Sequence, residues 1–127
     1  MTHTPISTAI PWALFVLGIG HIGYGLVKFR TPLARAVAAG FIGQFSVPED
    51  RRTAFWFVMF GPLLVLAGQV AVHAASVGDA YLIRVIGAYL FGICVVGVLA
   101  LPKSPFLLGL AISSLLLALG YGYIQPA

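Results

Sequence analysis

The chain has 127 residues, of which 61% are hydrophobic and 8% charged, and its mean hydropathy is +1.05. A water-soluble domain of this size does not have that composition, so we expect one transmembrane domain, residues 1–127, with membrane lipid as its partner. Seven Lys and Arg residues against three acids give a formal charge of +4. Because these bases flank apolar segments and form no basic groove, nucleic acid is excluded as a partner.

Four apolar segments, at about residues 10–27, 54–75, 80–101 and 105–123, are long enough to cross a hydrocarbon core. They are continuous and do not alternate with a period of two, so we expect helices, which satisfy their own backbone polar groups in lipid. Only residues 102–104 separate the last two segments, which predicts an antiparallel hairpin. The predicted fold class is therefore all-α, an antiparallel bundle of four transmembrane helices.

Charges and helix-start signals predict the topology. Thr31-Pro32 and Ser104-Pro105 are typical of an N-cap and first helical residue, and Asp79 suits the cap of the third span. The positive-inside rule places the basic first and third connections in the cytoplasm, which predicts a bacterial cytoplasmic (inner) membrane protein with its N- and C-termini outside. The basic residues in these connections are Lys28, Arg30, Arg35, Arg51, Arg52 and Lys103.

The first connection contains an apolar stretch, residues 31–47, that is too apolar for a solvated linker and too short to span. We expect an amphipathic surface helix or a re-entrant segment there. Gly40 and Gly43 should end or bend it, and Phe41, Ile42 and Phe45 could dip into the bilayer or cover the mouth of the bundle. The sequence leaves open whether the segment is a lid or a surface helix.

His21 is the candidate catalytic residue, with Tyr24 one turn further on. It lies about 11 residues, or roughly 16 Å, from the outer end of the first span, close to the middle of the bilayer. Gly18 and Gly25 flank it on the same face and leave room for a neighbouring helix or a ligand. Two interpretations stand side by side: acid–base or hydrogen-bonding contact with a lipophilic molecule, and a structural interhelical hydrogen bond.

The second span carries a heptad-like stripe that would place its polar residues and its proline on one inward face. Pro62 cannot donate to Val58, so the helix should kink after Gly61 and free a carbonyl group. We take the stripe as the candidate ligand-binding surface. Its predicted binding residues are Arg52, Phe55, Met59, Pro62, Gln69 and His73.

Metal and cofactor sites are not predicted. Cys94 is the single cysteine, so an intrachain disulfide or a cysteine-rich metal site is excluded. His21 and His73 differ in depth by roughly 13 Å, which one iron cannot bridge, and no further ligands at matching depth suggest zinc. The spans contain no interior carboxylate, which disfavours a proton-coupled transporter.

The run at residues 55–64, Phe-Trp-Phe-Val-Met-Phe-Gly-Pro-Leu-Leu, together with Arg52 and His21, resembles an uncharacterised family of small bacterial four-helix integral membrane proteins, a domain of unknown function. The resemblance covers nearly the whole chain and implies the topology but no activity. A looser likeness in size and helix count is to DoxX-like proteins and to the sterol-isomerase and sigma-receptor-like group. Those use acidic residues in the bundle that are absent here, so no site is carried over.

Three functions follow as hypotheses. The leading one is a bundle that binds a lipophilic small molecule, with isomerase or cyclase chemistry by His21 if the protein is an enzyme, a point that the sequence does not decide. The second is a structural or accessory membrane subunit that packs through Gly-rich helix faces, against a larger complex or as a homo-oligomer. The third is a small transporter.

Overall fold

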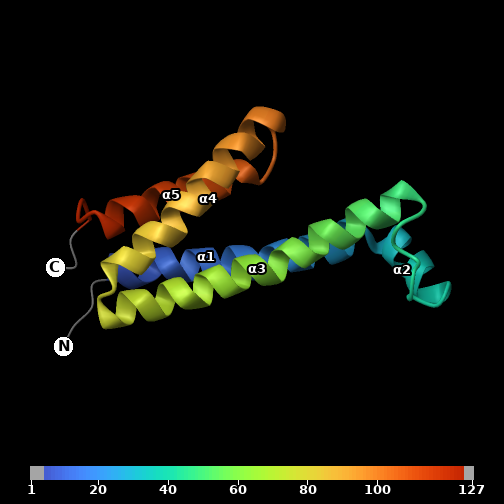
Figure 1. The fold of residues 1–127 in the computed structure, drawn as a ribbon, viewed down its shortest axis with the longest axis horizontal. Coiled ribbons are helices and arrows are strands. Elements are labelled where there is room, and N and C mark those ends of the chain that lie inside the picture. Colours follow the sequence, from blue (N-terminus) through green and yellow to red (C-terminus); the bar gives the residue numbers. More distant parts are fainter. Residues whose placement is uncertain (1–4, 125–127) are drawn as a thin grey trace.

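The computed structural model describes the backbone of residues 5–124 and the side chains from residue 8 onward. Within this range the chain is all-helical and has no strand. Its five helices, shown in Figure 1, are α1 (Pro5–Lys28), α2 (Arg30–Ala38), α3 (Glu49–Val77), α4 (Ala80–Ala100) and α5 (Phe106–Gly120).

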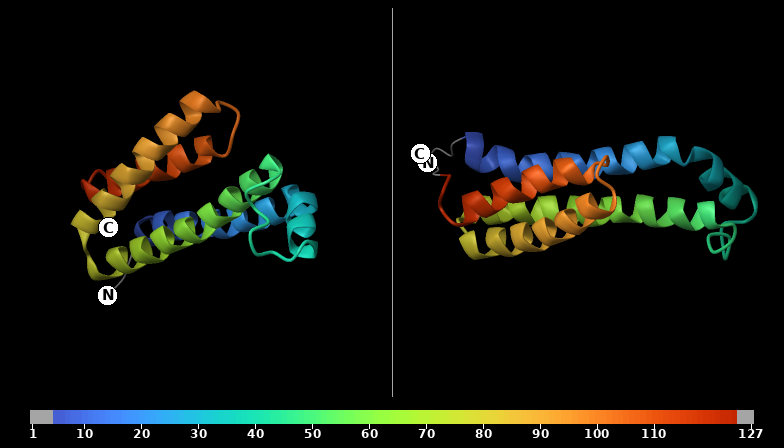
Figure 2. Two further views of the ribbon diagram at one scale, coloured as in Figure 1. Left: turned by 45° about the vertical axis from the view of Figure 1, so that its right-hand side comes forward. Right: turned by 90° about the horizontal axis from the view of Figure 1, so that it is seen from above.

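The long helices form two antiparallel pairs. The helix α1 packs along α3, and α4 packs along α5, while the contacts between the pairs are few. The pairs lie close together where α3 turns into α4, and they diverge toward the α4–α5 connection (Figures 1 and 2). The described part of the molecule is therefore a wedge, closed at the α3–α4 turn and open at the opposite end of the α4–α5 hairpin.

The closed end of the wedge follows from a very short α3–α4 turn. Gly78 ends α3 in the left-handed region, with φ of 74°, which glycine adopts without steric cost. Asp79 follows immediately, and its side chain accepts a hydrogen bond of 3.0 Å from the backbone N–H of Leu82. This confirms the predicted cap. Because only two residues join the helices, α4 must begin beside the end of α3.

Small residues allow the helices of each pair to approach closely. A Cβ atom added to Gly18 on α1 would lie 2.6 Å from the backbone nitrogen of Val65 on α3, and one added to Gly68 would meet the backbone of Phe15. In the second pair, a Cβ on Gly87 would lie 3.2 Å from the backbone nitrogen of Leu117. In membranes such contacts replace the hydrophobic drive between helices with van der Waals packing.

Buried leucines complete this packing at the closed end, where the two pairs meet. Leu14, Leu64, Leu90 and Leu116 belong to one cluster of buried residues contributed by α1, α3, α4 and α5. Leu14 and Leu116 are almost completely enclosed. The apolar core therefore lies at the α3–α4 end of the wedge and leaves the other end open.

Three helices are long and apolar enough to cross a membrane, at Thr8–Lys28, Glu49–Val77 and Ala80–Ala100. The fourth apolar helix, Phe106–Gly120, has 15 residues, or about 22 Å, which is shorter than a hydrocarbon core of roughly 30 Å. The fourth crossing therefore stays a prediction.

Two of the predicted helix starts are displaced by one or two residues. The helix α2 begins at Arg30 with Phe29 as its N-cap, so its cap lies two residues before the predicted Thr31. Pro105 is the N-cap of α5 rather than its first residue, although the Ser104 hydroxyl accepts a bond of 3.3 Å from the Phe106 N–H. The capping signals locate these helices but do not fix their first residues, because helix ends fray by one or two residues.

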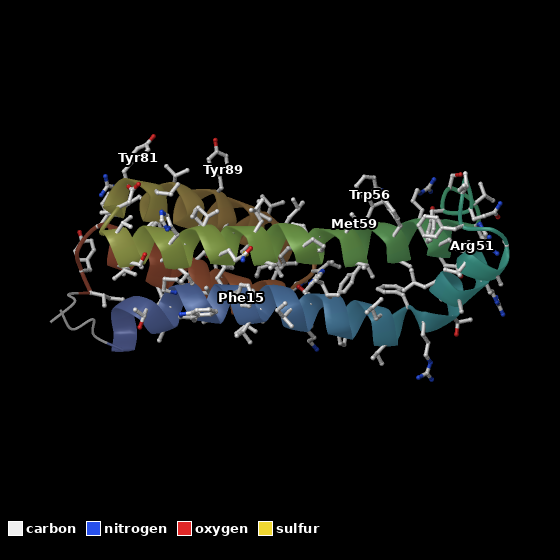
Figure 3. All side chains as sticks on the ribbon, turned by 90° about the horizontal axis from the view of Figure 1, so that it is seen from below. Phe15, Arg51, Trp56, Met59, Tyr81 and Tyr89 are labelled. Atoms are coloured by element: carbon white, nitrogen blue, oxygen red, sulfur yellow. The ribbon has the colours of Figure 1, made fainter. Side chains whose placement is uncertain are left out.

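The predicted inward face of the second span is wrong. In α3 the buried residues are Ala54, Gly61, Leu64, Gly68, Ala71 and Ala74. The stripe chosen from the sequence instead faces outward: Met59 is 44% exposed, and Figure 3 shows it projecting away from α1. Small residues determine the packed face because they let α1 approach. The stripe residues Arg52, Pro62, Gln69 and His73 are also exposed, and Phe55 is half-buried.

The first connection forms the short helix α2 and a loop, both next to the far ends of α1 and α3 (Figure 2). The helix ends at Ala38, and Gly40 and Gly43 follow with φ of 111° and 72°, which confirms that these glycines end and bend the segment. Phe45 contacts Phe41 and Phe55 through ring centroids 5.1 and 5.3 Å apart. The aromatic residues of the loop thus pack on the start of α3.

Candidate functional site

A cavity of about 1290 Å³ lies between the α1–α3 pair and the α4–α5 hairpin. It is larger than the roughly 300–1,000 Å³ typical of small-molecule pockets. Its narrow end is formed by Leu14, Leu64 and Leu90, which belong to the buried core. No residue of the segment 31–47 lines it, so in this structure that segment is not a lid over the cavity.

The α1 wall of the cavity is a single stripe of the helix. Leu14, Leu17, His21, Tyr24 and Lys28 line it, with alternating spacings of three and four residues. Residues at this spacing share one face of an α-helix. This stripe is therefore apolar at the closed end, polar in the middle and cationic at the open end.

The α3 wall is offset from the predicted stripe. Thr53, Phe57, Phe60 and Leu64 line the cavity, together with Trp56 at its edge. Thr53, Trp56 and Phe60 each lie one residue after a member of the predicted stripe, and Phe57 and Leu64 lie two residues after one. One residue corresponds to a rotation of about 100° around the helix. Three aromatic residues of α3, Trp56, Phe57 and Phe60, thus belong to the cavity wall.

His21 makes an interhelical hydrogen bond inside this cavity. Its Nε2 donates to the backbone carbonyl of Phe57 over 2.8 Å, since a carbonyl can only accept. Its ring stacks on the Phe57 ring, with centroids 4.0 Å apart and planes 16° apart, and meets the Phe60 ring edge-on at 5.5 Å. The half-buried imidazole is therefore held in one orientation by a donor bond and two rings.

The acceptor of this bond lies beside the proline in α3. Pro62 has no N–H, so the Val58 carbonyl loses its usual partner and the neighbouring turn is weakened. His21 binds the adjacent carbonyl, that of Phe57. The bond expected of a structural histidine is thus present, and the same side chain lines the cavity. In a neutral ring that donates through Nε2, the nitrogen left to accept a hydrogen bond is Nδ1.

Tyr24 and Lys28 continue the α1 wall toward the open end. The Tyr24 ring is 6.0 Å from that of Phe57, and its side chain is 52% exposed. The Lys28 ammonium lies 5.6 Å from the centroids of both the Tyr24 and Phe29 rings, in cation–π contact. The polar groups on α1 thus come together at one wall.

The structure divides the residues proposed from the sequence. His21, Tyr24 and Arg52 line the cavity, whereas Phe55, Met59, Pro62, Gln69 and His73 do not. Sequence reasoning did not select Phe57, Phe60 and Cys94 or the lysines at positions 28 and 103, all of which line it. On α1, the lining residues could have been found from the alternating spacing of three and four residues that passes through His21. On α3, the spacing of glycine and alanine marks the packed face and so indicates which residues lie beside it.

Outside the cavity, Arg84 lies at the closed end of the molecule. Its guanidinium donates to the Gly120 carbonyl over 3.0 Å and lies 5.3 Å from the Tyr121 ring. This bond satisfies a carbonyl at the end of α5. Arg84 therefore connects α4 to the end of α5.

Metal-ligating side chains do not gather anywhere in residues 5–124: no three His, Cys, Asp or Glu residues lie close enough to hold an ion. Cys94 is buried in the cavity wall, where it packs against Gly109. The cavity lining also contains no Asp or Glu. Within the described chain the site can offer apolar contact, aromatic faces, hydrogen bonds and positive charge.

The fold and the site define a class: an all-helical chain with membrane-spanning capacity and an apolar cavity between two helical pairs. Comparison with protein families identifies the chain more closely. The profile of a family of unknown function, DUF6463, matches residues 6–121, and the chain belongs to this family. No curated protein and no solved structure matches it.

Proposed function

We propose that this protein binds a lipophilic small molecule within the membrane, in the cavity between the α1–α3 pair and the α4–α5 hairpin. One observation carries the proposal: a cavity of about 1290 Å³ with apolar walls also contains the oriented imidazole of His21 and the phenol of Tyr24. Apolar walls with a few placed polar groups are the usual composition of a ligand site. His21 and Tyr24 would supply the polar contacts to the ligand.

Binding fits the geometry better than catalysis. The Nε2 proton of His21 is already donated to the Phe57 carbonyl, so only Nδ1 is left for a ligand. An isomerase or cyclase reaction would need this one nitrogen to move a proton on a bound substrate. Hydrogen bonding through Nδ1 requires no such step, and it is the role that we assign to His21.

The proposal includes a topology. The chain crosses a bacterial cytoplasmic membrane four times as one domain, with both termini outside, and α5 crosses with local thinning of the bilayer. The basic first and third connections support the orientation, because both lie at the end opposite the α3–α4 turn. The cavity would then open toward the cytoplasmic leaflet.

The test is native mass spectrometry with lipidomics on gently purified wild type, His21→Ala and His73→Ala. His73 is a matched control because it is an exposed histidine of α3 that does not line the cavity. We expect a specific molecule on wild type and on His73→Ala, and its loss or depletion on His21→Ala. Identical lipid on all three proteins, in the proportions of the surrounding membrane, would show that the cavity has no ligand of its own.

A specific observation favours a second candidate, an accessory subunit or homo-oligomer. Gln69 is exposed on α3, roughly 12 Å from the helix end, and its side-chain amide makes no hydrogen bond within the described chain. An amide in lipid favours a partner on another helix. The interface would be the outward stripe of α3, because the glycines at positions 18, 61 and 68 already pack α1 against α3.

The second candidate predicts that Gln69→Leu shifts the protein toward a monomer in light scattering. Ser114→Ala is the control, because that exposed serine already donates to the Leu110 carbonyl over 2.8 Å and should not affect assembly. An unchanged mass for Gln69→Leu would remove the basis for this interface.

A further inference from the structure

The open end of the cavity is positively charged. Three cationic residues line it: Lys28 at the end of α1, Arg52 in the first turns of α3 and Lys103 in the α4–α5 connection. No acidic residue lines the cavity at any depth. The cavity is therefore amphipathic, with leucines at its closed end and cations at its mouth, and the cations come from both sides of the wedge.

These cations are largely free to bind an anion. Lys28 contacts only aromatic rings, and Lys103 has neither an ion pair nor a hydrogen bond among residues 5–124. Arg52 pairs with Glu49 over 3.4 Å, but the side chains are 52% and 82% exposed, so this pair is weak and exchangeable. The mouth thus keeps a net positive charge, because Arg52 is the one cation of the three with an acidic partner in the described chain.

We propose that the ligand is a membrane lipid with an anionic headgroup, whose chains lie in the cavity and whose headgroup is bound by Lys28, Arg52 and Lys103. This inference rests on the proposed function and names its ligand class. The cavity volume exceeds that of a drug-sized pocket and suits a lipid with two hydrocarbon chains. The cations supply charge-assisted hydrogen bonds to phosphate oxygens.

The two tryptophans allow a direct test. Trp56 lines the cavity and Trp12 does not, and the chain has no other tryptophan. In a Trp12→Phe protein, Trp56 is the single remaining tryptophan, so bromine atoms on lipid chains in the cavity would quench its fluorescence. The probes are phosphatidylglycerol and phosphatidylcholine with identical brominated chains, titrated into purified full-length protein in neutral detergent. A Trp56→Phe protein, which reports from Trp12, is the control for nonspecific lipid.

Charge variants separate the cavity mouth from general surface charge. Lys28→Gln with Lys103→Gln removes two cations from the lining, and Arg30→Gln with Arg35→Gln removes two exposed cations of the first connection that do not line it. We expect phosphatidylglycerol to quench Trp56 saturably at a concentration about three- to tenfold below that of phosphatidylcholine. This preference should disappear in the lysine variant and persist in the arginine variant.

Three results would overturn the inference. Equal saturable quenching by both lipids would remove headgroup recognition but leave the cavity as a binding site. Equal loss of preference in both double variants would assign the effect to general charge and not to the mouth. Absence of saturable quenching at Trp56 with either lipid would overturn a membrane lipid as the ligand, and the mass-spectrometric comparison with His21→Ala would then test the proposed function separately.

Discussion

Replacement of His21 tests the link between the cavity wall and the stability of the bundle. His21→Phe keeps a ring that can stack on Phe57 but removes the 2.8 Å hydrogen bond to the Phe57 carbonyl. Interhelical hydrogen bonds in membranes contribute about 0.6 kcal/mol on average and up to about 1.7 kcal/mol. We expect His21→Phe to lower the free energy of unfolding by this amount.

His21→Ala removes the ring as well as the bond. The stacked contact with Phe57 and the edge contact with Phe60 are lost, and an aromatic pair contributes about 0.5–1.5 kcal/mol beyond its buried area. With both aromatic contacts and the hydrogen bond lost, the expected total decrease in the free energy of unfolding is about 2–5 kcal/mol. The order of stability should therefore be wild type, then His21→Phe, then His21→Ala.

The assay is reversible unfolding in mixed micelles of a mild detergent and dodecyl sulfate, followed by far-ultraviolet circular dichroism. His73→Phe is the matched control, because an exposed histidine without a ring contact should change the free energy by less than about 0.5 kcal/mol. A His21→Phe protein as stable as wild type, or less stable than His21→Ala, would refute the role assigned to the hydrogen bond.

Three further predictions follow from the packing. Gly18→Ala should lower the free energy of unfolding by about 1–3 kcal/mol in the same assay, because its Cβ would lie 2.6 Å from the Val65 nitrogen. Gly20→Ala is the control and should have no effect, because the space around Gly20 is open. Equal effects of the two substitutions would contradict the α1–α3 packing. Arg84→Gln should lower the melting temperature, because it removes the hydrogen bond to the Gly120 carbonyl, which contributes about 1 kcal/mol to stability. An unchanged melting temperature would contradict a stabilising role for this bond. Cys94 is buried in the cavity wall and should therefore react faster with an apolar maleimide than with a charged one, as followed by intact-protein mass spectrometry. The reverse order would show that reagents do not reach Cys94 through the apolar cavity.

Local sequence determined the helical character of this chain and several of its boundaries. Continuous apolar segments predict helices because an isolated segment in lipid must satisfy its own backbone polar groups. Asp79 caps α4 and Gly40 and Gly43 follow α2, as predicted, because these features depend on residues within a few positions of one another. For the same reason the hairpin of α4 and α5 follows from a short connection.

The tertiary structure decided which face of α3 is packed. Two stripes compete in that helix, and they differ by a rotation of about 100°, or one residue. The polar stripe with Gln69 and His73 suggested an inward face, but α1 packs where Gly61 and Gly68 allow its backbone to approach. Sequence periodicity alone could not choose between the stripes, because the choice depends on how a second helix fits.

The cavity itself also depends on tertiary structure. Lys28, Arg52 and Lys103 belong to three separate parts of the sequence, and they share one cavity only because the α4–α5 hairpin diverges from the α1–α3 pair. The divergence arises from the two-residue turn at Gly78 and Asp79 and from close packing at one end alone. The sequence determined by itself that the chain forms apolar helices with basic connections, since both depend on local composition. The space between the helices is set by contacts among residues far apart in the chain.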